Sequence, residues 1–168
     1  MLRLSSRLLT HPQHCFCVQK ARFESGLDNS PMYDGEFFDT NGTHLMQLYD
    51  VGMSSMFVQE AYSLAELADA IGRSEGEMLR ARGDAMAKKI ASELWDEQGG
   101  IFTNKFPNGT FYRRISPTSF YALQTKAPTD EQAAGMATSW LMNSSRFCIA
   151  PNGDFAGNGD ACYWGVSL

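Results

Sequence analysis

Residues 50–94 read DVGMSSMFVQEAYSLAELADAIGRSEGEMLRARGDAMAKKIASEL. In the first half of this stretch, apolar residues recur at steps of three and four, the spacing that places them on one side of an α-helix. They are Met53, Phe57, Ala61, Leu64, Ala68 and Ile71. Gly72 offers a flexible or left-handed position near the end of this helix. The pattern predicts an amphipathic helix from Asp50 to Arg73.

The second half of the stretch predicts another helix. Ser74 and Glu77 have the spacing of a capping box, which marks a helix start. A further apolar stripe follows and continues until Gly99 and Gly100 stop it; it consists of Leu79, Met86, Ile90 and Leu94. Two long helices joined by a short turn predict an antiparallel pair.

Beyond the helical pair, the sequence predicts a small β-hairpin. Residues 101–106 and 111–115 are rich in aromatic and β-branched residues, and Asn108-Gly109 between them is a strong hairpin-turn signal. Thr129 and Gln132 mark a third helix start, and residues after Asn143 read as a long polar loop. The predicted fold is mainly α, with paired helices typical of a helical toroid or solenoid, a small β-hairpin insertion and long polar loops.

Composition limits the function classes. The chain has 168 residues, 43% of them hydrophobic, which suits one globular domain or part of one. The formal net charge is -5 and the charges are mixed along the chain, so we expect no nucleic-acid partner. No apolar run approaches the ~20 residues that span a bilayer.

Residues 1–23 differ from the rest, because Arg3, Arg7, Lys20 and Arg22 occur with no acidic residue before Glu24. This composition is typical of a mitochondrial presequence. Pro12 would interrupt the helix of such a presequence, so a translated upstream segment or a misplaced start explains it equally well. We expect the domain to begin at residue 24 and to run to 168, and the compartment, mitochondrial or cytoplasmic, stays open.

The sequence gives no pattern for a metal or another cofactor. Its closest approach to a metal cluster is the group His11, His14, Cys15 and Cys17, whose spacing matches no common zinc site. Cys15 and Cys17 are also too close for an easy unstrained disulfide. We therefore expect neither a metal nor a cofactor.

The most informative polar segment is residues 24–34, ESGLDNSPMYD. Carboxylates, an amide, a hydroxyl and an aromatic ring are concentrated in a stretch of turn-forming residues, as in loops that bind ligands. Asp28 and Asn29 before Ser-Pro are also strong local turn formers, so a purely local role for them is the alternative.

In this segment the chain resembles a group of glycoside hydrolases with an (α/α)6 barrel, namely the processing α-glucosidases and the related mannosylglycerate and glucosylglycerate hydrolases. Five blocks carry the resemblance, in the family's order: ESGLDNSP at 24–31, WDE at 95–97, GGIF at 99–102, SFYAL at 119–123 and GDACYW at 159–164. The resemblance implies a partial (α/α)6 toroid and inverting hydrolysis of an α-glycosidic bond.

The resemblance also implies roles for residues. Asp28 corresponds to the general acid, which gives a proton to the departing glycosidic oxygen. Residues that would bind the sugar or line its pocket are Glu24, Asn29, Tyr33, Asp34, Tyr163 and Trp164. The family's Tyr-Trp-Arg-Gly block lacks its arginine here, since Gly165 follows Trp164 directly. That departure weakens the sugar-binding role of the last two residues.

An inverting enzyme needs a second carboxylate, a general base about 6.5–9.5 Å from the acid. In the resembled family this base lies far downstream of the Tyr-Trp block, and the present sequence ends first. Glu60, on the apolar side of the first predicted helix, is the conspicuous internal substitute; the alternative is that it borders the stripe or forms an ion pair. We expect a catalytic-domain fragment with the acid but not the base, weakly active or inactive alone.

Two other functions stay open at this point. One is a non-catalytic helical module that binds a sugar or a protein, and the other is an unrelated mitochondrial helical protein. For the hydrolase, a glucoside and a mannoside are equally compatible with the resemblance. The sequence does not specify an oligomeric state.

Overall fold

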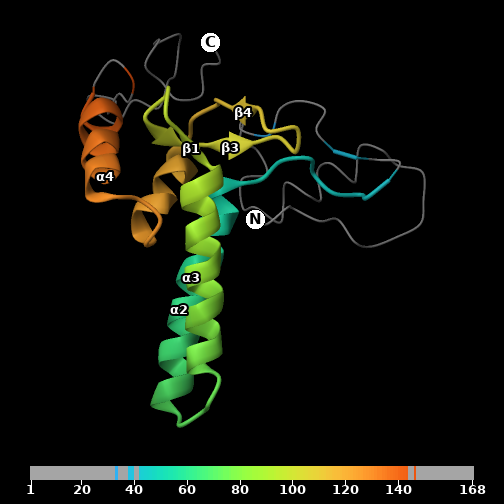
Figure 1. The fold of residues 1–168 in the computed structure, drawn as a ribbon, viewed down its shortest axis with the longest axis vertical. Coiled ribbons are helices and arrows are strands. Elements are labelled where there is room, and N and C mark those ends of the chain that lie inside the picture. Colours follow the sequence, from blue (N-terminus) through green and yellow to red (C-terminus); the bar gives the residue numbers. More distant parts are fainter. Residues whose placement is uncertain (1–32, 34–37, 40–41, 144–145, 147–168) are drawn as a thin grey trace, which may run out of the picture.

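The computed structural model describes Tyr33, residues 38–39, residues 42–143 and Arg146. This part of the chain is mainly α-helical with two small antiparallel hairpins, in agreement with the predicted fold class (Figure 1). It is consistent with part of a helical toroid. The basic segment 1–23 and nearly all of the long polar loop predicted after Asn143 lie outside the described residues. None of the described helices is both long and apolar enough to cross a membrane.

The predicted helical pair is confirmed. Helix α2 (Val51–Ala70) and helix α3 (Gly76–Glu93) run side by side and project from the rest of the described chain as a long arm (Figure 1). Gly72 has a φ of 71°, the left-handed conformation that was predicted for the end of α2.

The predicted capping box at the start of α3 is wrong. Glu75 is the N-cap residue of α3, and no side chain caps the helix there. The Glu75 carboxylate pairs instead with the Arg73 guanidinium at 2.5 Å. The short turn between the helices places Ser74 outside the position that a capping box requires.

The two helices pack closely, and the predicted apolar side of α2 is confirmed only in part, since Ala61 and Ala68 are buried. The buried residues of α2 are Val51, Gly52, Ser54, Ser55, Val58, Ala61, Ala65 and Ala68. On α3 the buried Gly83 lies so close to α2 that an added Cβ would be 2.9 Å from the Tyr62 ring. Small residues on both helices allow this close approach.

Large apolar residues consequently lie on the exposed side of α2. They are Met56, Leu64, Leu67 and Ile71, the last 74% exposed. The predicted packing side was therefore wrong for Leu64 and Ile71, and Glu60 lies exposed among them rather than against the core. A helix that is apolar on two opposite sides is typical of one with neighbours on both sides.

The region after α3 forms two hairpins where one was predicted. Strand β1 (Trp95–Asp96) pairs with β2 (Ile101–Phe102), and β3 (Asn104–Lys105) pairs with β4 (Phe111–Tyr112). Gly100 (φ 63°) lies in the first turn and Gly109 (φ 90°) in the second. The Asn-Gly turn was predicted correctly, but the predicted strand 101–106 is divided between the two hairpins.

The remaining elements lie near the end of the helical pair where α2 begins and α3 ends (Figure 1). They are the 3₁₀-helix η2 (Pro117–Gln124), which the sequence did not predict, helix α4 (Asp130–Met136) and the π-helical turn η3 (Ala137–Leu141). The capping box of Thr129 and Gln132 is confirmed. The main hydrophobic cluster lies where these elements meet, and it includes Val58, Ile90, Leu94, Phe102, Ala122 and Met136.

Candidate functional site

Tyr33 is the one predicted site residue that the structure describes. It is 1% exposed and forms a small cluster with Met46 and Leu48, separate from the main core. Its hydroxyl donates a hydrogen bond of 2.6 Å to Oδ2 of Asp50. The other predicted site residues lie outside the described residues: Glu24, Asp28, Asn29, Asp34, Tyr163 and Trp164.

Asp50 is a buried carboxyl group at the start of α2. It is the N-cap residue, and its Oδ1 accepts from the backbone N–H of Met53 at 2.7 Å. Its second oxygen, Oδ2, accepts from Tyr33 and, at 3.3 Å, from the side-chain amide of Asn104. With 1% of its surface exposed, Asp50 uses both oxygens inside the protein.

Asn104 connects this group to the second hairpin. While its Nδ2 donates to Asp50, its Oδ1 accepts from the backbone N–H of Val51 at 2.8 Å. It lies in β3, 53 residues further along the chain than Val51, and is fully buried. We call Tyr33, Asp50 and Asn104 the buried network; it joins three segments that are distant in sequence.

Burial raises the pKa of the Asp50 carboxyl above its ordinary value of 3.8, because the charged form loses its hydration. Hydrogen bonds to the carboxylate act in the opposite direction; they come from Tyr33, Met53, Gly52 and Asn104. The net direction is upward. The folded protein therefore binds the Asp50 proton more tightly than the unfolded chain does.

This shift predicts how stability depends on pH. The contribution of a carboxyl with a raised folded-state pKa is greatest below about pH 3.8 and falls as the pH rises through the folded-state value. In Asp50→Asn this loss is absent, so the variant should gain stability relative to wild type as the pH rises. The gain is about 1.4 kcal/mol for each pH unit by which the pKa is raised. Urea unfolding between pH 3 and 7 measures it.

Asp84→Asn is the matched control. Its hydrogen bond from Tyr62, and then its contact with Lys126, lower the pKa of Asp84. The stability that this carboxylate contributes is present above its ordinary pKa and is lost as the pH falls. The two difference curves should therefore slope in opposite directions. Parallel slopes would show that burial does not raise the pKa of Asp50.

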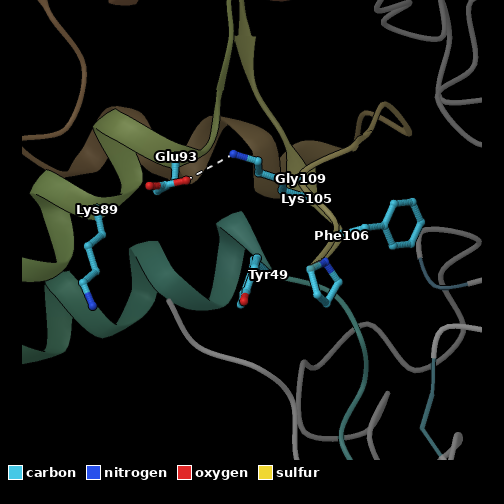
Figure 2. Close-up of a pocket in the computed structure, with 7 residues that line it drawn as sticks. Tyr49, Lys89, Glu93, Lys105, Phe106 and Gly109 are labelled. Carbon is cyan, nitrogen blue, oxygen red and sulfur yellow. Dashed lines mark hydrogen bonds and ion pairs between the residues drawn. The ribbon is translucent and has the colours of Figure 1, made fainter.

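A hollow, whose lining residues Figure 2 shows, includes chain neighbours of the buried network. The backbones of Tyr49 and Lys105 pair through hydrogen bonds of 2.8 and 3.1 Å, one residue away from Asp50 and Asn104 respectively. The hollow has a volume of about 510 Å³ and is lined by Tyr49, Lys89, Glu93, Lys105, Phe106, Pro107 and Gly109. The network thus adjoins the bridge between Tyr49 and Lys105, two residues that line this hollow.

The hollow contains an ion pair. Lys105 reaches Glu93 with its ammonium 3.1 Å from the carboxylate, as Figure 2 shows. The same ammonium lies 5.3 Å from the centre of the Phe111 ring. Hydroxyl, carboxylate and ammonium groups beside an aromatic ring can hydrogen-bond sugar hydroxyls.

A second polar cluster connects the two hairpins. The Arg113 guanidinium binds the buried Asp96 carboxylate with both Nε (2.6 Å) and Nη2 (3.2 Å), and Nη2 also donates to Gln98 at 2.7 Å. The hydrogen bond to Asp96 raises the pKa of Arg113. This bidentate pair fixes the geometry of the β1–β2 turn relative to β4.

In the part of the chain that the structure describes, no group of three or more histidine, cysteine or carboxylate side chains is placed to hold a metal ion. The cluster at His11, His14, Cys15 and Cys17 lies outside that part.

The sequence pointed to Tyr33 but not to its partners. Asp50 was visible as the first residue of the predicted helix, and aspartate is a preferred N-cap, so a signal for its local role existed. Asn104 carried no such signal, because its role depends on a contact with residues more than fifty positions away.

Residues 14–153 match a protein-family model described as a mannosylglycerate hydrolase MGH1-like glycoside hydrolase domain. The matched span contains the segment 24–34 and the whole buried network, and it ends before Tyr163 and Trp164. Among curated proteins, no significant match to the chain was found.

Proposed function

The chain belongs to the family of MGH1-like glycoside hydrolase domains, and from this premise we propose that it carries the general acid of an inverting α-glycosidase. A glycoside hydrolase domain acts on carbohydrate, and we propose an α-mannoside or α-glucoside as substrate. The observation that carries the proposal is the family match across residues 14–153, because it contains the complete segment ESGLDNSPMYD.

Asp28 is the proposed acid. Hydrolysis of an alkyl glycoside requires a proton on the leaving oxygen, and a carboxylic acid in a confined site can supply it. We propose that Glu24, Asn29 and Asp34 bind sugar hydroxyls or orient the acid, and that Tyr33 lies at the pocket wall. Tyr163 and Trp164 are proposed to line the same pocket.

We propose no partner base for Asp28 among the described residues. Glu60, the substitute that the sequence offered, is exposed on α2 and lies about 15 Å along the helix axis from Asp50. An exposed carboxylate among apolar residues is a poor setting for activating a water molecule against a bound sugar. We therefore propose that the chain alone hydrolyses glycosides slowly or not at all.

Azide can test an acid without a base. Water must lose a proton as it attacks the anomeric carbon, whereas azide is already an anion and needs no base. As azide forms the new C–N bond, the C–O bond breaks and the leaving oxygen takes its proton from Asp28. We expect azide to accelerate consumption of a methyl α-glycoside at least about tenfold, with the β-glycosyl azide as product.

Fast hydrolysis in plain buffer, with no further acceleration by azide, would show that the chain has a general base and would contradict this part of the proposal. Calorimetric titration with the same glycosides provides the comparison with a binding module. Tight sugar binding without consumption, in both the presence and the absence of azide, would favour the non-catalytic module instead.

A further inference from the structure

We propose that the hollow lined by Tyr49, Lys89, Glu93 and Lys105 binds a sugar acid, that is, a polyhydroxy compound with one carboxylate (Figure 2). The Lys89 ammonium binds the carboxylate of this ligand, and Glu93 accepts hydrogen bonds from its hydroxyl groups. The inference goes beyond the proposed hydrolysis, because a free sugar acid has no glycosidic bond to cleave.

Contacts within the protein hold the walls of the hollow in place. Tyr49 and Lys105 pair through two backbone hydrogen bonds, and the Lys105 ammonium lies 3.1 Å from the Glu93 carboxylate at the end of α3. In the turn of the second hairpin, Gly109 donates to the carbonyl of Phe106 at 2.9 Å. The volume of about 510 Å³ is within the range of small-molecule sites. A ligand therefore meets walls that the fold has already placed.

Lys89 gives the hollow an excess of positive charge. The lining contains the ammonium groups of Lys89 and Lys105 but only one carboxylate, that of Glu93. Lys105 is paired with Glu93, whereas the Lys89 ammonium has no ion pair or hydrogen bond within the part of the chain that the structure describes. The local excess is opposite in sign to the formal net charge of the chain, which is -5. An ammonium without a counterion at the edge of a hollow favours an anionic ligand.

Glu93 decides which anion fits. Its Oε2 binds Lys105, while its Oε1 has no hydrogen-bond partner among the described residues, and the side chain is 53% exposed. A carboxylate oxygen accepts from hydroxyl groups and repels additional negative charge. Sulfate offers two negative charges and no hydroxyl. A ligand with one carboxylate and several hydroxyl groups matches both Lys89 and Glu93.

The remaining lining is partly apolar. Tyr49 and Pro107 contribute ring carbons beside the polar groups. Small-molecule sites commonly combine such apolar walls with a few polar groups that fix the orientation of the ligand. The carbon-bound face of a sugar ring can lie against these rings while its substituents reach Lys89 and Glu93.

Titration of the ¹⁵N-labelled full chain with sodium D-glucuronate at pH 7 and low ionic strength tests the proposal. The amide chemical shifts of Lys105 and Gly109 should move and saturate with a Kd of about 1 mM. The amide of Gly76, at the opposite end of α3, should not move. D-glucose has the same ring without the carboxylate, so it should bind at least about tenfold more weakly.

Lys89→Gln removes the proposed carboxylate ligand, and Lys88→Gln is the matched control. Both lysines are exposed on α3 and both substitutions change the net charge equally, but Lys88 does not line the hollow. We expect Lys89→Gln to weaken glucuronate binding at least about tenfold and Lys88→Gln to weaken it less than about twofold. Thermal unfolding should be the same in both variants, because neither side chain is buried.

Three results would overturn the inference. The first is an absence of shifts at Lys105 and Gly109, or an equal loss of affinity in the two lysine variants, since either shows that the hollow is not the site. The second is equal affinity for D-glucose, which contradicts recognition of a carboxylate. The third is that inorganic phosphate binds as tightly as glucuronate, which contradicts selection by Glu93. These binding measurements need no turnover, so they are independent of the proposed role of Asp28.

Discussion

Asp28→Asn is expected to slow the cleavage of a methyl α-glycoside in the presence of azide by about 10²–10⁴-fold. The reason is that a methoxide leaving group is strongly basic and must be protonated as it departs. Asparagine has nearly the shape of aspartate but no proton of suitable acidity. Initial rates of glycoside consumption, with azide present to remove the need for a base, provide the measurement.

Leaving groups distinguish proton donation from a structural defect. A dinitrophenyl glycoside departs as a stable anion and needs little acid assistance, so Asp28→Asn should slow its cleavage far less than that of the methyl glycoside. Asp34→Asn is the comparison within the same segment: it should slow both substrates alike if Asp34 binds sugar hydroxyls, and the methyl glycoside more if Asp34 orients the acid. An equal loss on both substrates for Asp28→Asn would show that Asp28 is not the acid.

Phe102→Ala is expected to lower the free energy of unfolding by about 3–5 kcal/mol. Phe102 is fully buried in the main hydrophobic cluster, and its ring centroid is 4.9 Å from that of Trp95. Truncation removes apolar contacts and leaves a cavity at the point where the first hairpin meets the base of α2 and α3. Urea unfolding monitored by circular dichroism gives the change.

Phe111→Ala is the matched control for this prediction. Phe111 lies in β4 of the neighbouring hairpin, is only partly buried and has the Lys105 ammonium beside its ring. We expect its truncation to lower the free energy of unfolding by less than half as much. A partly exposed ring buries less apolar surface on folding, and its removal leaves no closed cavity. Similar losses in the two variants would contradict the position of the core at the first hairpin.

Local sequence signals predicted the helical pair, the left-handed Gly72, the Asn-Gly turn and the Thr129 capping box, and all four are confirmed. Each depends on residues within one or two turns of chain. The capping box at Ser74 failed although it is also local, because the turn geometry between α2 and α3 moved the helix start.

Signals that depend on packing were less successful. The predicted apolar stripe is buried at Ala61 and Ala68, but its larger members Leu64 and Ile71 are exposed. Periodicity identifies a helix and its apolar positions. It cannot decide which of two apolar sides of the helix is buried. On the side of α2 that faces α3, Gly83 lies so close to Tyr62 that a Cβ would not fit without a shift.

The sequence by itself determined that this chain is a member of a glycoside hydrolase family, that it is mainly α-helical, and that the segment containing Asp28 and Tyr33 is its chemically richest stretch. Motifs and helical periodicity are properties of neighbouring residues, so they can be read along the chain. Only the tertiary structure decided that Tyr33 meets Asp50 and that Asn104 completes the network from a distant hairpin. Such partners are selected by burial, since a polar group removed from water must bind whichever donor or acceptor the packed chain brings to it.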